Sequence, residues 1–292
     1  MDDFKSIFYM EWAHRMWGRA IGLAFIIPGA YFAYKGYMNK AMTLRSGVVG
    51  LLIGCQGILG WFMVKSGLDD ELMEIPHAMP RVSHYWLAAH LGSAFLIYSG
   101  MFLTGLEIIR SHKPIQWKEK VLKVLTESRL VRFKRFSIAT AVMVFITALS
   151  GALVAGLDAG LIYNEFPYMG LGFVPSDMWA LSTESKSNPS PIPWWRNLLE
   201  NSSAVQFNHR VMAISTSTVI LGLWTYSRRL PLPRQSRLAI NALLGVTAIQ
   251  VSLGISTLLY LVPVPLAAAH QAGSLTLLSV ALWLVHTLRI IR

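Results

Sequence analysis

The sequence has little cysteine and little charge, and each shortage excludes a class of protein. Cys55 is the only cysteine among 292 residues, which excludes an intramolecular disulfide and a cysteine metal cluster. Charged residues make up 14% of the chain and hydrophobic residues 54%. This composition excludes an ordinary soluble globular domain, in which about 25% of residues are charged. The chain is instead dominated by long uncharged runs.

These uncharged runs have the length of membrane spans, since about 20 helical residues cross a hydrocarbon layer of about 30 Å. The runs are 46–64, 82–106, 136–157, 211–227 and 238–288. Pro263 and Pro265 divide the last run into two crossings, and the apolar stretch 20–34 adds one more. We therefore predict an all-α integral membrane protein with seven transmembrane helices. The predicted helices are 13–34, 46–64, 84–106, 136–157, 207–227, 238–262 and 266–288.

Acidic residues are fewer than basic ones, 15 against 26, and the two kinds are sorted along the chain. Most basic residues lie in alternate connections, which are 35–45, 110–135, 228–237 and the C-terminal tail. Most acidic residues lie in the other connections. The net charge of +11 therefore indicates orientation in a membrane and not a nucleic-acid partner. By the positive-inside rule, we expect the N-terminus outside and the C-terminus inside.

Three landmarks recur in the same order at nearly the same spacing, which indicates two related halves. They are His14-Arg15 and His209-Arg210, Gln56-x-x-Leu59-Gly60 and Gln250-x-x-Leu253-Gly254, and Leu87-Ala-Ala-His90 and Ala267-Ala-Ala-His270. We expect two pseudo-symmetric helical bundles, with three helices in the N-terminal half and four in the C-terminal half, because the helix at 136–157 has no counterpart before His14. The expected parts are an N-terminal bundle at 1–110, a basic linker at 111–135, and a C-terminal bundle at 136–292 with an outer loop at 158–206.

Four histidines occupy the early turns of helices that are predicted to run in the same direction. His14 and His90 should therefore lie at similar depth, and so should His209 and His270. Two imidazoles that face each other across a helical bundle can ligate a haem iron from both sides. A single histidine near a helix end is more commonly an interhelical hydrogen bonder, but two matched pairs favour haem. The repeat alone leaves open a pairing of His14 with His209.

Ionisable and polar residues near these histidines indicate further roles. Cations that could neutralise haem propionates are Arg15, Arg19, Arg81 and Arg210. Glu11 shares a helical face with His14, so it serves either proton transfer at a bound ring or capping of the helix. Gln56 and Gln250 are predicted to be interhelical hydrogen bonders. The histidines expected to be structural or solvated are His77, His84, His112 and His286.

Several longer motifs are specific to one family. They are Glu-Trp-Ala-His-Arg-Met-Trp-Gly-Arg at 11–19, Arg81-Val-Ser with Leu-Ala-Ala-His90-Leu, Thr147-Ala-Leu-Ser-Gly-Ala-Leu-Val-Ala-Gly-Leu-Asp-Ala-Gly160, Tyr163-Asn164, Phe166-Pro167, Asn208-His209-Arg210 and Ala269-His270-Gln271. Through these motifs, which cover nearly all of the chain, the sequence resembles haem A synthase of the mitochondrial type. The resemblance implies two four-helix bundles, each with a histidine pair. It also implies oxidation of a methyl group on haem O to a formyl group, which gives haem A for the terminal oxidase.

The resemblance implies roles for individual residues. His209 and His270 are associated with a haem B cofactor, and His14 and His90 with the substrate haem. Glu11 matches an acid near the substrate pocket, where we expect stepwise hydroxylation followed by loss of water while haem B relays electrons. Expected partners are haem O, haem A, the lipid bilayer, an electron donor, the haem O-producing enzyme and further copies of the chain. The targeting segment and the first helix of the family are not recognisable in this sequence.

The absence of outer-loop cysteine pairs favours the mitochondrial subgroup of the resembled family. The expected location is therefore the mitochondrial inner membrane with the C-terminus in the matrix, and the alternative is a bacterial plasma membrane. Two other functions fit the same pattern. A b-type cytochrome would keep haem at all four histidines and carry electrons. A small-solute transporter would use histidines as proton relays, but the helix interiors offer few polar residues for a pathway.

Overall fold

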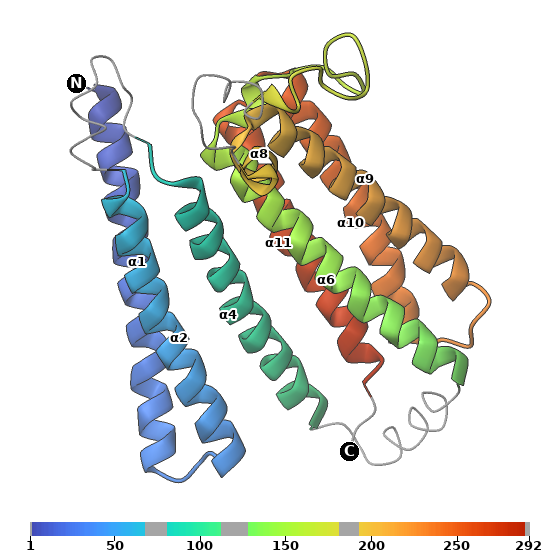
Figure 1. Cartoon of the computed structure of the whole chain (residues 1–292). Helices are drawn as coiled ribbons and strands as arrows, with labels where there is room; N and C mark the ends of the chain where they lie inside the picture. Colours follow the sequence, from blue (N-terminus) through green and yellow to red (C-terminus); the bar gives the residue numbers. More distant parts are fainter. Residues whose placement is uncertain (1, 68–80, 112–127, 181–192, 290–292) are drawn as a thin grey trace.

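The computed structural model describes residues 2–67, 81–111, 128–180 and 193–289, and every regular element within these residues is helical. The long helices are α1 (Asp2–Tyr34), α2 (Lys40–Lys65), α4 (His84–Ser111), α6 (Ser128–Gly156), α9 (Ser202–Ser227), α10 (Arg234–Leu259) and α11 (Val264–Thr287). The short ones are the 3₁₀ turn η1 (Ala159–Leu161) and α8 (Trp194–Glu200). All seven predicted long helices are therefore present (Figure 1).

Six of these helices are long and apolar enough to cross a membrane, namely α1, α2, α4, α6, α10 and α11. The chain is thus a multi-pass helical membrane protein, as predicted. The seventh helix, α9, has the same length of 26 residues as α2 and α10. It is more polar because Gln206, Asn208, His209 and Arg210 occupy its first half. The helix whose apolar character is weakest is therefore one of those that carry the predicted ligands.

Local sequence signals set several helix ends. The Asn39 side chain accepts a hydrogen bond of 2.8 Å from the backbone N–H of Met42 and so caps α2. Asn201 caps α9 in the same way, accepting from the N–H groups of Ser203 and Ala204. Pro263 precedes α11, where a missing N–H costs nothing. The predicted division of the last apolar run between two helices is confirmed.

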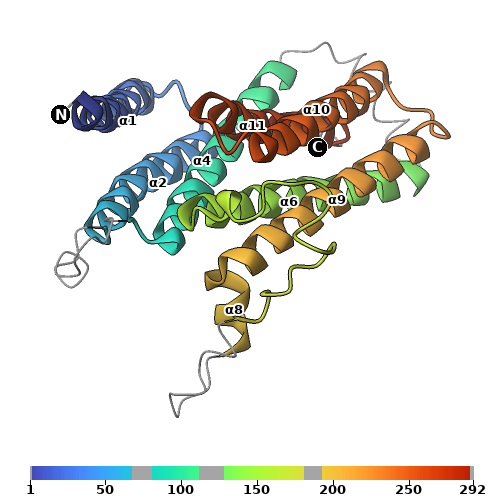
Figure 2. The ribbon, with the colours of Figure 1, turned by 90° about the horizontal axis from the view of Figure 1, so that it is seen from above.

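The helices form a closed group and an open group. In the closed group, α6, α9, α10 and α11 pack around one another, and α4 packs against both α6 and α11 (Figure 1, Figure 2). In the open group, α2 packs against α4, and α1 packs on α2. The helix α4 therefore contacts both groups, although the sequence placed it only in the N-terminal bundle.

Two predicted boundaries differ from the structure. The segment 111–135 was expected to be a linker, but α6 begins at Ser128 and includes its last basic residues. These residues continue the helical pattern of the apolar run, so charge alone does not mark the helix start. The expected outer loop at 158–206 contains η1, α8 and the first turn of α9. Part of that loop is therefore ordered structure on top of the bundle.

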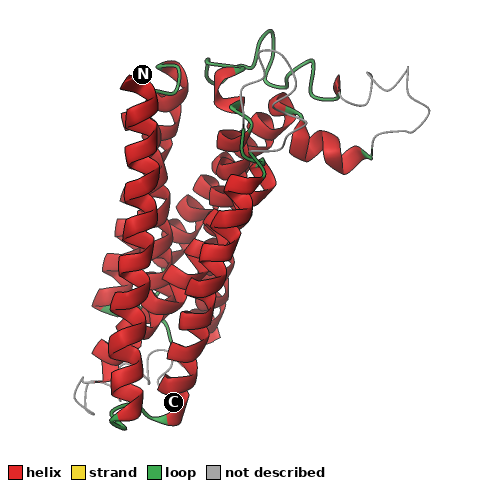
Figure 3. Cartoon of the chain, turned by 90° about the vertical axis from the view of Figure 1, so that its left-hand side faces the viewer, coloured by secondary structure: helices red, strands yellow, loops and turns green. Residues whose placement is uncertain are grey.

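The connections are sorted between the two ends of the molecule. The C-terminus lies at the same end as the α1–α2 and α9–α10 connections, which we call the basic end (Figure 1). The N-terminus lies at the opposite end, which we call the histidine end (Figure 3), and α8 lies at that end too (Figure 1). The alternate placement of basic connections that the sequence predicted is therefore present in the fold.

The apolar core lies mainly in the half of the closed group that is nearer to the basic end. It includes Phe133 of α6, Ile220 of α9, Leu243 of α10 and Leu284 of α11, none of them more than 1% exposed. Every buried residue of α11 lies at or after Leu277. The first half of α11, which carries His270, is not tightly packed by protein side chains. At the histidine end α11 is thus more exposed, whereas the start of α9 is buried there too.

Candidate functional site

His14 and His90 are brought together by α1 and α4. Their ring centroids lie 6.4 Å apart, and the ring planes are nearly perpendicular at 89°. Two imidazoles on one haem iron would have ring centres about 6 Å apart, because each iron–nitrogen bond is about 2 Å and each nitrogen lies about 1 Å from its ring centre. The separation in this pair therefore matches what a single haem iron requires. His14 itself is exposed.

A glutamine and a glycine on α2 fix the position of His90. The side-chain amide of Gln56 donates to the backbone carbonyl of His90 at 2.8 Å, and Ser93 donates to the Gln56 carbonyl oxygen. A Cβ on Gly60 would lie 2.9 Å from Cε1 of His90, so the imidazole rests directly on the backbone of α2. Only a glycine allows this approach.

The same arrangement recurs in the C-terminal half. The side-chain amide of Gln250 donates to the backbone carbonyl of His270 at 2.9 Å. A Cβ on Gly254 would lie 2.9 Å from Cε1 of His270, as at Gly60. The repeated Gln-x-x-x-Gly spacing therefore places a hydrogen-bonding amide and a glycine that contacts the imidazole on one face of a helix. We call each such glutamine and glycine pair a histidine seat. The prediction that Gln56 and Gln250 are interhelical hydrogen bonders is confirmed.

His209 is held by one turn of α6. Its Nδ1 atom lies 2.7 Å from the Ser150 hydroxyl oxygen, and that hydroxyl donates to the backbone carbonyl of Thr147 at 2.7 Å. A Cβ on Gly151 would lie 3.1 Å from Cε1 of His209. His90, His209 and His270 thus each lie against a glycine of the neighbouring helix.

His209 and His270 are the second predicted pair. They lie on α9 and α11 of the same four-helix group, each against a glycine of a neighbouring helix. Both pairings agree with the repeat, and α9 packs on α10 and α6 but not closely on α1. The first half of α11, which carries His270, contributes no buried residue.

The donor set suits a haem better than a bare metal ion. Within the described ranges, no three His, Cys, Asp or Glu side chains gather to hold a metal ion. A haem iron already has four porphyrin nitrogens and needs only axial ligands, for which imidazole is a common choice. Two imidazoles in an apolar bundle are therefore a sufficient protein contribution.

The second ring nitrogen of the histidine has a different partner in each half. The Ser150 hydroxyl, which donates to the Thr147 carbonyl, lies 2.7 Å from Nδ1 of His209. At His90, the side-chain amide nitrogen of Gln56 lies 3.2 Å from Nδ1.

The cations and the acid predicted around the histidines are found in several settings. Arg15 forms an ion pair with Glu11 on the exposed face of α1. Arg19 lies beside Met16, with its Nη1 3.4 Å from the sulfur. Arg81 pairs with Asp158 at 2.8 Å, and both side chains are about half exposed. Their predicted roles toward haem propionates and the reacting ring remain predictions.

Arg210 has a defined structural task. It is only 8% exposed, and its two terminal nitrogens donate to the backbone carbonyls of Tyr163 and Tyr168 at 2.9 and 3.1 Å. Gln206, one turn earlier, also donates to the Tyr163 carbonyl. Arg210 therefore fastens residues 163–178, which we call the outer strap, to α9. Any contact with a propionate would be additional to this role.

Asp177 anchors the other end of the outer strap. It accepts hydrogen bonds from the hydroxyls of Tyr163 at 2.7 Å and Ser203 at 2.6 Å. Burial alone would raise the pKa of Asp177, but the two hydroxyl donors outweigh it and hold that pKa below its usual value. The hydrogen bond to Asp177 raises the pKa of Tyr163. The strap thus covers the start of α9 next to His209.

The remaining histidines agree with the structural roles expected of them where they are described. His84 packs closely on Gly156 and joins α4 to α6. His286 is 7% exposed and lies at the basic end of α11. His77 and His112 lie outside the described residues.

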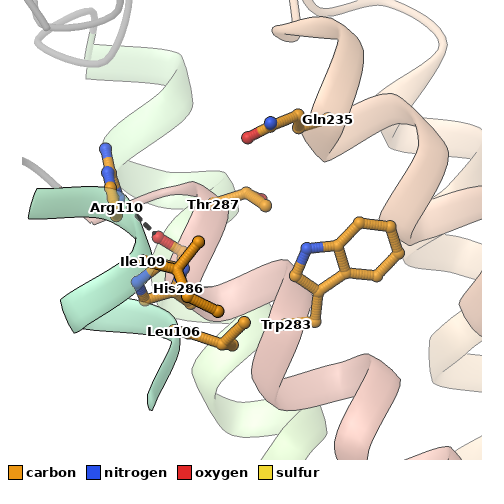
Figure 4. A pocket seen from close by; sticks show the side chains of 7 residues that line it. All are labelled: Leu106, Ile109, Arg110, Gln235, Trp283, His286 and Thr287. Atoms are coloured by element: carbon orange, nitrogen blue, oxygen red, sulfur yellow. Dashed lines mark hydrogen bonds between the residues drawn. The ribbon is translucent and has the colours of Figure 1, made fainter. Parts of the chain in front are cut away.

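A small cavity lies between the basic ends of α4 and α11 and the start of α10. Figure 4 shows the side chains that line it. Its volume is about 120 Å³, and residues of α4, α10 and α11 line it, including Trp283 and His286. Ligand pockets usually measure about 300–1,000 Å³, so this cavity is too small for a porphyrin. Arg110 crosses its edge and donates to the carbonyls of His286 and Arg289, each at 2.8 Å. The cavity therefore marks where α4 is fastened to α11.

Sequence reasoning did not assign functions to Ser150, Gly151, Gly60 or Gly254. Gly60 and Gly254 were visible as part of the repeated motif, but a repeat does not say which side chain a glycine accommodates. Ser150 and Gly151 lie in the Thr147–Gly160 motif without a repeated counterpart. Their contact with His209 depends on how α6 packs against α9.

Comparison with known proteins gives one consistent result. Residues 1–282 match the model of the COX15-CtaA family, described as cytochrome oxidase assembly protein. Over 289 residues, the chain is 50% identical to heme A synthase COX15 of Bos taurus, covering 98% of this chain and 64% of the relative.

More distant relatives agree. Heme A synthase COX15 of Saccharomyces cerevisiae is 43% identical over 99% of this chain and 61% of its own length. Heme A synthase of Nitrosospira multiformis is 42% identical over 99% of this chain and 74% of its own length. The chain spans less than two thirds of the length of the mammalian and yeast relatives. With nearly all of its length matched, this chain belongs to the COX15-CtaA family of cytochrome oxidase assembly proteins.

Proposed function

We propose that this chain is a haem A synthase, which oxidises a methyl group of haem O to the formyl group of haem A. The relatives reported above carry the name heme A synthase, and the family is described as acting in cytochrome oxidase assembly. A synthase of this kind must hold one haem as substrate, with O₂ or water as the source of the formyl oxygen, and must pass electrons between that haem and a redox partner. Two separate haem sites in one chain are suited to both tasks.

The observation that carries the proposal is the repeated histidine seat. Gln56 and Gly60 contact His90 with nearly the same distances as Gln250 and Gly254 contact His270. Two equivalent seats with an imidazole partner each supply two positions for bis-histidine ligation.

We assign the C-terminal half, residues 136–292, to a haem B cofactor. His209 and His270 would hold its iron, and the bound haem B would supply one-electron redox chemistry. Ser150 presents His209 in the tautomer that binds iron. The outer strap and Arg210 cover this end of the bundle and limit access of water to it.

We assign the N-terminal half, residues 1–110, to the substrate haem O and the product haem A. His14 and His90 would hold the substrate, with Arg15 and Arg19 at the exposed end of α1 to neutralise its propionates. Conversion of a methyl group to a formyl group also requires proton transfer at the reacting ring. Glu11, one turn from His14, is the carboxylate that would serve it.

The proposed setting is the mitochondrial inner membrane, with the basic end in the matrix. The excess of Lys and Arg in the connections at that end supports this orientation. The proposed partners are an electron donor and the enzyme that supplies haem O. A product that leaves for the terminal oxidase requires a site from which haem can depart, and the exposed setting of His14 suits that requirement.

Pigment analysis of cells that depend on this chain for haem A tests the proposal. Cells with the wild-type chain should yield haem A in extracts separated by liquid chromatography. His14→Ala and His90→Ala should abolish haem A and leave haem B in the purified protein. His286→Gln, at the basic end, should behave as the wild type.

The alternatives give different pigments. Haem B alone in the wild-type protein, with no haem O or haem A at any stage, would identify a b-type electron carrier and reject the synthase. Normal haem A in the His14→Ala and His90→Ala variants would reject the assignment of the N-terminal half.

A further inference from the structure

We propose that Ser150 is the positioning residue of His209, holding Nδ1–H so that Nε2 is free to bind a haem iron. The inference rests on the proposed function, since it concerns the haem assigned to the C-terminal half. It adds a residue of α6 to a site whose ligands come from α9 and α11.

The hydrogen-bond geometry carries the inference. The Ser150 oxygen lies 2.7 Å from Nδ1 of His209 and 2.7 Å from the Thr147 carbonyl. A hydroxyl has one hydrogen, and a carbonyl can only accept, so that hydrogen points to Thr147. The serine oxygen must then accept from Nδ1–H.

The neighbouring glycine fixes the depth of the ring. A Cβ on Gly151 would come within 3.1 Å of Cε1 of His209, which is closer than nearly all real Cβ contacts. The ring therefore lies against the α6 backbone, at the height where Ser150 reaches Nδ1. Ser150 and Gly151 together set the rotation of the His209 ring and its distance from the α6 backbone.

His270, the proposed ligand on the other side, has no comparable hydrogen bond to its ring within the described ranges. Nδ1 of His270 is buried and has no hydrogen-bond partner among the described residues, and the same is true of the Gln250 carbonyl oxygen. The residue three positions after His270 is Gly273, where the N-terminal half has Ser93. His209 is therefore oriented by the protein before haem arrives, whereas the ring of His270 is restrained mainly by Gly254 and its backbone.

A hydrogen bond from the second ring nitrogen has two measurable effects on a metal ligand. It raises the basicity of the ligand, which stabilises oxidised iron, and it supports metal affinity, since loss of such a partner typically lowers affinity about 10- to 100-fold. Both effects should disappear when the hydroxyl of Ser150 is removed.

The experiment compares variants of the full chain purified in detergent. Ser150→Ala removes the acceptor, and Ser150→Thr keeps a hydroxyl. Ser137→Ala is the matched control, because Ser137 is buried in the same helix and donates to Phe133 at 2.9 Å without touching a histidine. Haem affinity is measured by titration with haem B, and the midpoint potential of the low-spin haem by redox titration.

Ser150→Ala should bind haem B about 10- to 100-fold more weakly and show a higher midpoint potential. Ser150→Thr should restore both values towards the wild type, and Ser137→Ala should change neither. A Ser150→Ala protein with unchanged affinity and potential would overturn the inference while leaving the proposed function intact. Equal losses in Ser150→Ala and Ser150→Thr would also overturn it, by showing that packing and not the hydroxyl matters. A wild-type protein that binds no low-spin haem would instead reject the proposed function.

Discussion

The two halves of the molecule use the same histidine seat in different surroundings. In the C-terminal half, four helices enclose His209 and His270, and α4 packs on their outer side. In the N-terminal half, α2 has no buried residue. The helix α1 packs closely on α2 and on no other described helix. Each histidine seat, meaning the glutamine and glycine that contact His90 or His270, therefore needs only two helices. How well the histidine is enclosed depends on the number of helices around it.

The halves also differ in how their histidines are prepared for iron. At His209, Nδ1 lies against the Ser150 hydroxyl, which we propose selects the iron-binding tautomer. At His90, Nδ1 lies against the amide nitrogen of Gln56. A permanent cofactor benefits from a preformed ligand. A substrate that must leave as product benefits from a ligand that the protein can take back. The difference between the two seats thus agrees with the proposed division into a cofactor half and a substrate half.

The largest effect is expected from filling the seat in the closed half. Gly254→Val would place a side chain where a Cβ alone already meets Cε1 of His270 at 2.9 Å. Overpacking of this kind costs about 1–3 kcal/mol and here displaces a ligand directly. The affinity for haem B should therefore fall about 5- to 150-fold, since 1.4 kcal/mol is a factor of ten.

Gly245→Val in the same helix is the control, because nothing lies within 4 Å of a Cβ there. Normal haem content in Gly254→Val would show that the seat is not part of the haem site. Equal losses in both variants would show that α10 does not tolerate valine at all.

The same substitution in the open half should be milder for the cofactor. Gly60→Val should displace His90 and reduce haem A in cell extracts, but haem B should stay bound because the C-terminal pair is untouched. Gly57→Val, one turn away with open space around its Cβ, is the control. If haem B fell as far in Gly60→Val as in Gly254→Val, the halves would not be separate sites.

Removing the glutamine of each seat should reveal a smaller difference between the halves, in thermal stability. Gln56 bonds His90 and Ser93, whereas Gln250 makes one described hydrogen bond, to His270. Hydrogen bonds between membrane helices average about 0.6 kcal/mol, so Gln56→Leu should lower the melting temperature more than Gln250→Leu. Thermal unfolding in detergent measures both. The opposite order would contradict the hydrogen bonding described for the two seats.

The sequence was sufficient to predict the parts of this comparison that depend on local pattern. Long uncharged runs predicted the helices, and the paired landmarks singled out the four histidines but left their pairing open. The start of α6 at Ser128 was not predicted, because the basic residues there belong to the helix and not to a linker. Ser150 was missed because its role depends on the packing of α6 against α9. The role of Arg210 in holding the outer strap on α9 was not predicted, because its partners are backbone carbonyls distant in the sequence.

The outer strap should respond to pH. The pKa of Asp177 is lowered, so its hydrogen bonds stabilise the strap above the ordinary carboxyl pKa of about 4 and are lost as pH falls through the lowered value. The pKa of Tyr163 is raised, so its contribution holds below about pH 10 and is lost as pH rises further. Protection factors for hydrogen exchange at the strap, which are corrected for the intrinsic exchange rate at each pH, should therefore be largest between these limits. Asp177→Asn should flatten the acid limb, and an unchanged profile would contradict the role of Asp177.

The smallest effect is expected at the exposed ion pair of Arg81 and Asp158. Both side chains are about half exposed, and such pairs contribute about 0–1 kcal/mol. Arg81→Ala should shift the melting temperature little, and it should leave haem B content unchanged. A large loss of haem B would show that Arg81 contacts the cofactor instead of serving only as a surface partner of Asp158.

The central claim is that His209 and His270 are the two axial ligands of a haem in the C-terminal half. Titration of the purified chain with haem B, followed by the low-spin absorbance spectrum, tests it most directly. The wild type and His286→Gln should take up a six-coordinate low-spin haem, and His209→Ala and His270→Ala should each lose that species. Retention of the full low-spin signal in His209→Ala or His270→Ala would contradict the account.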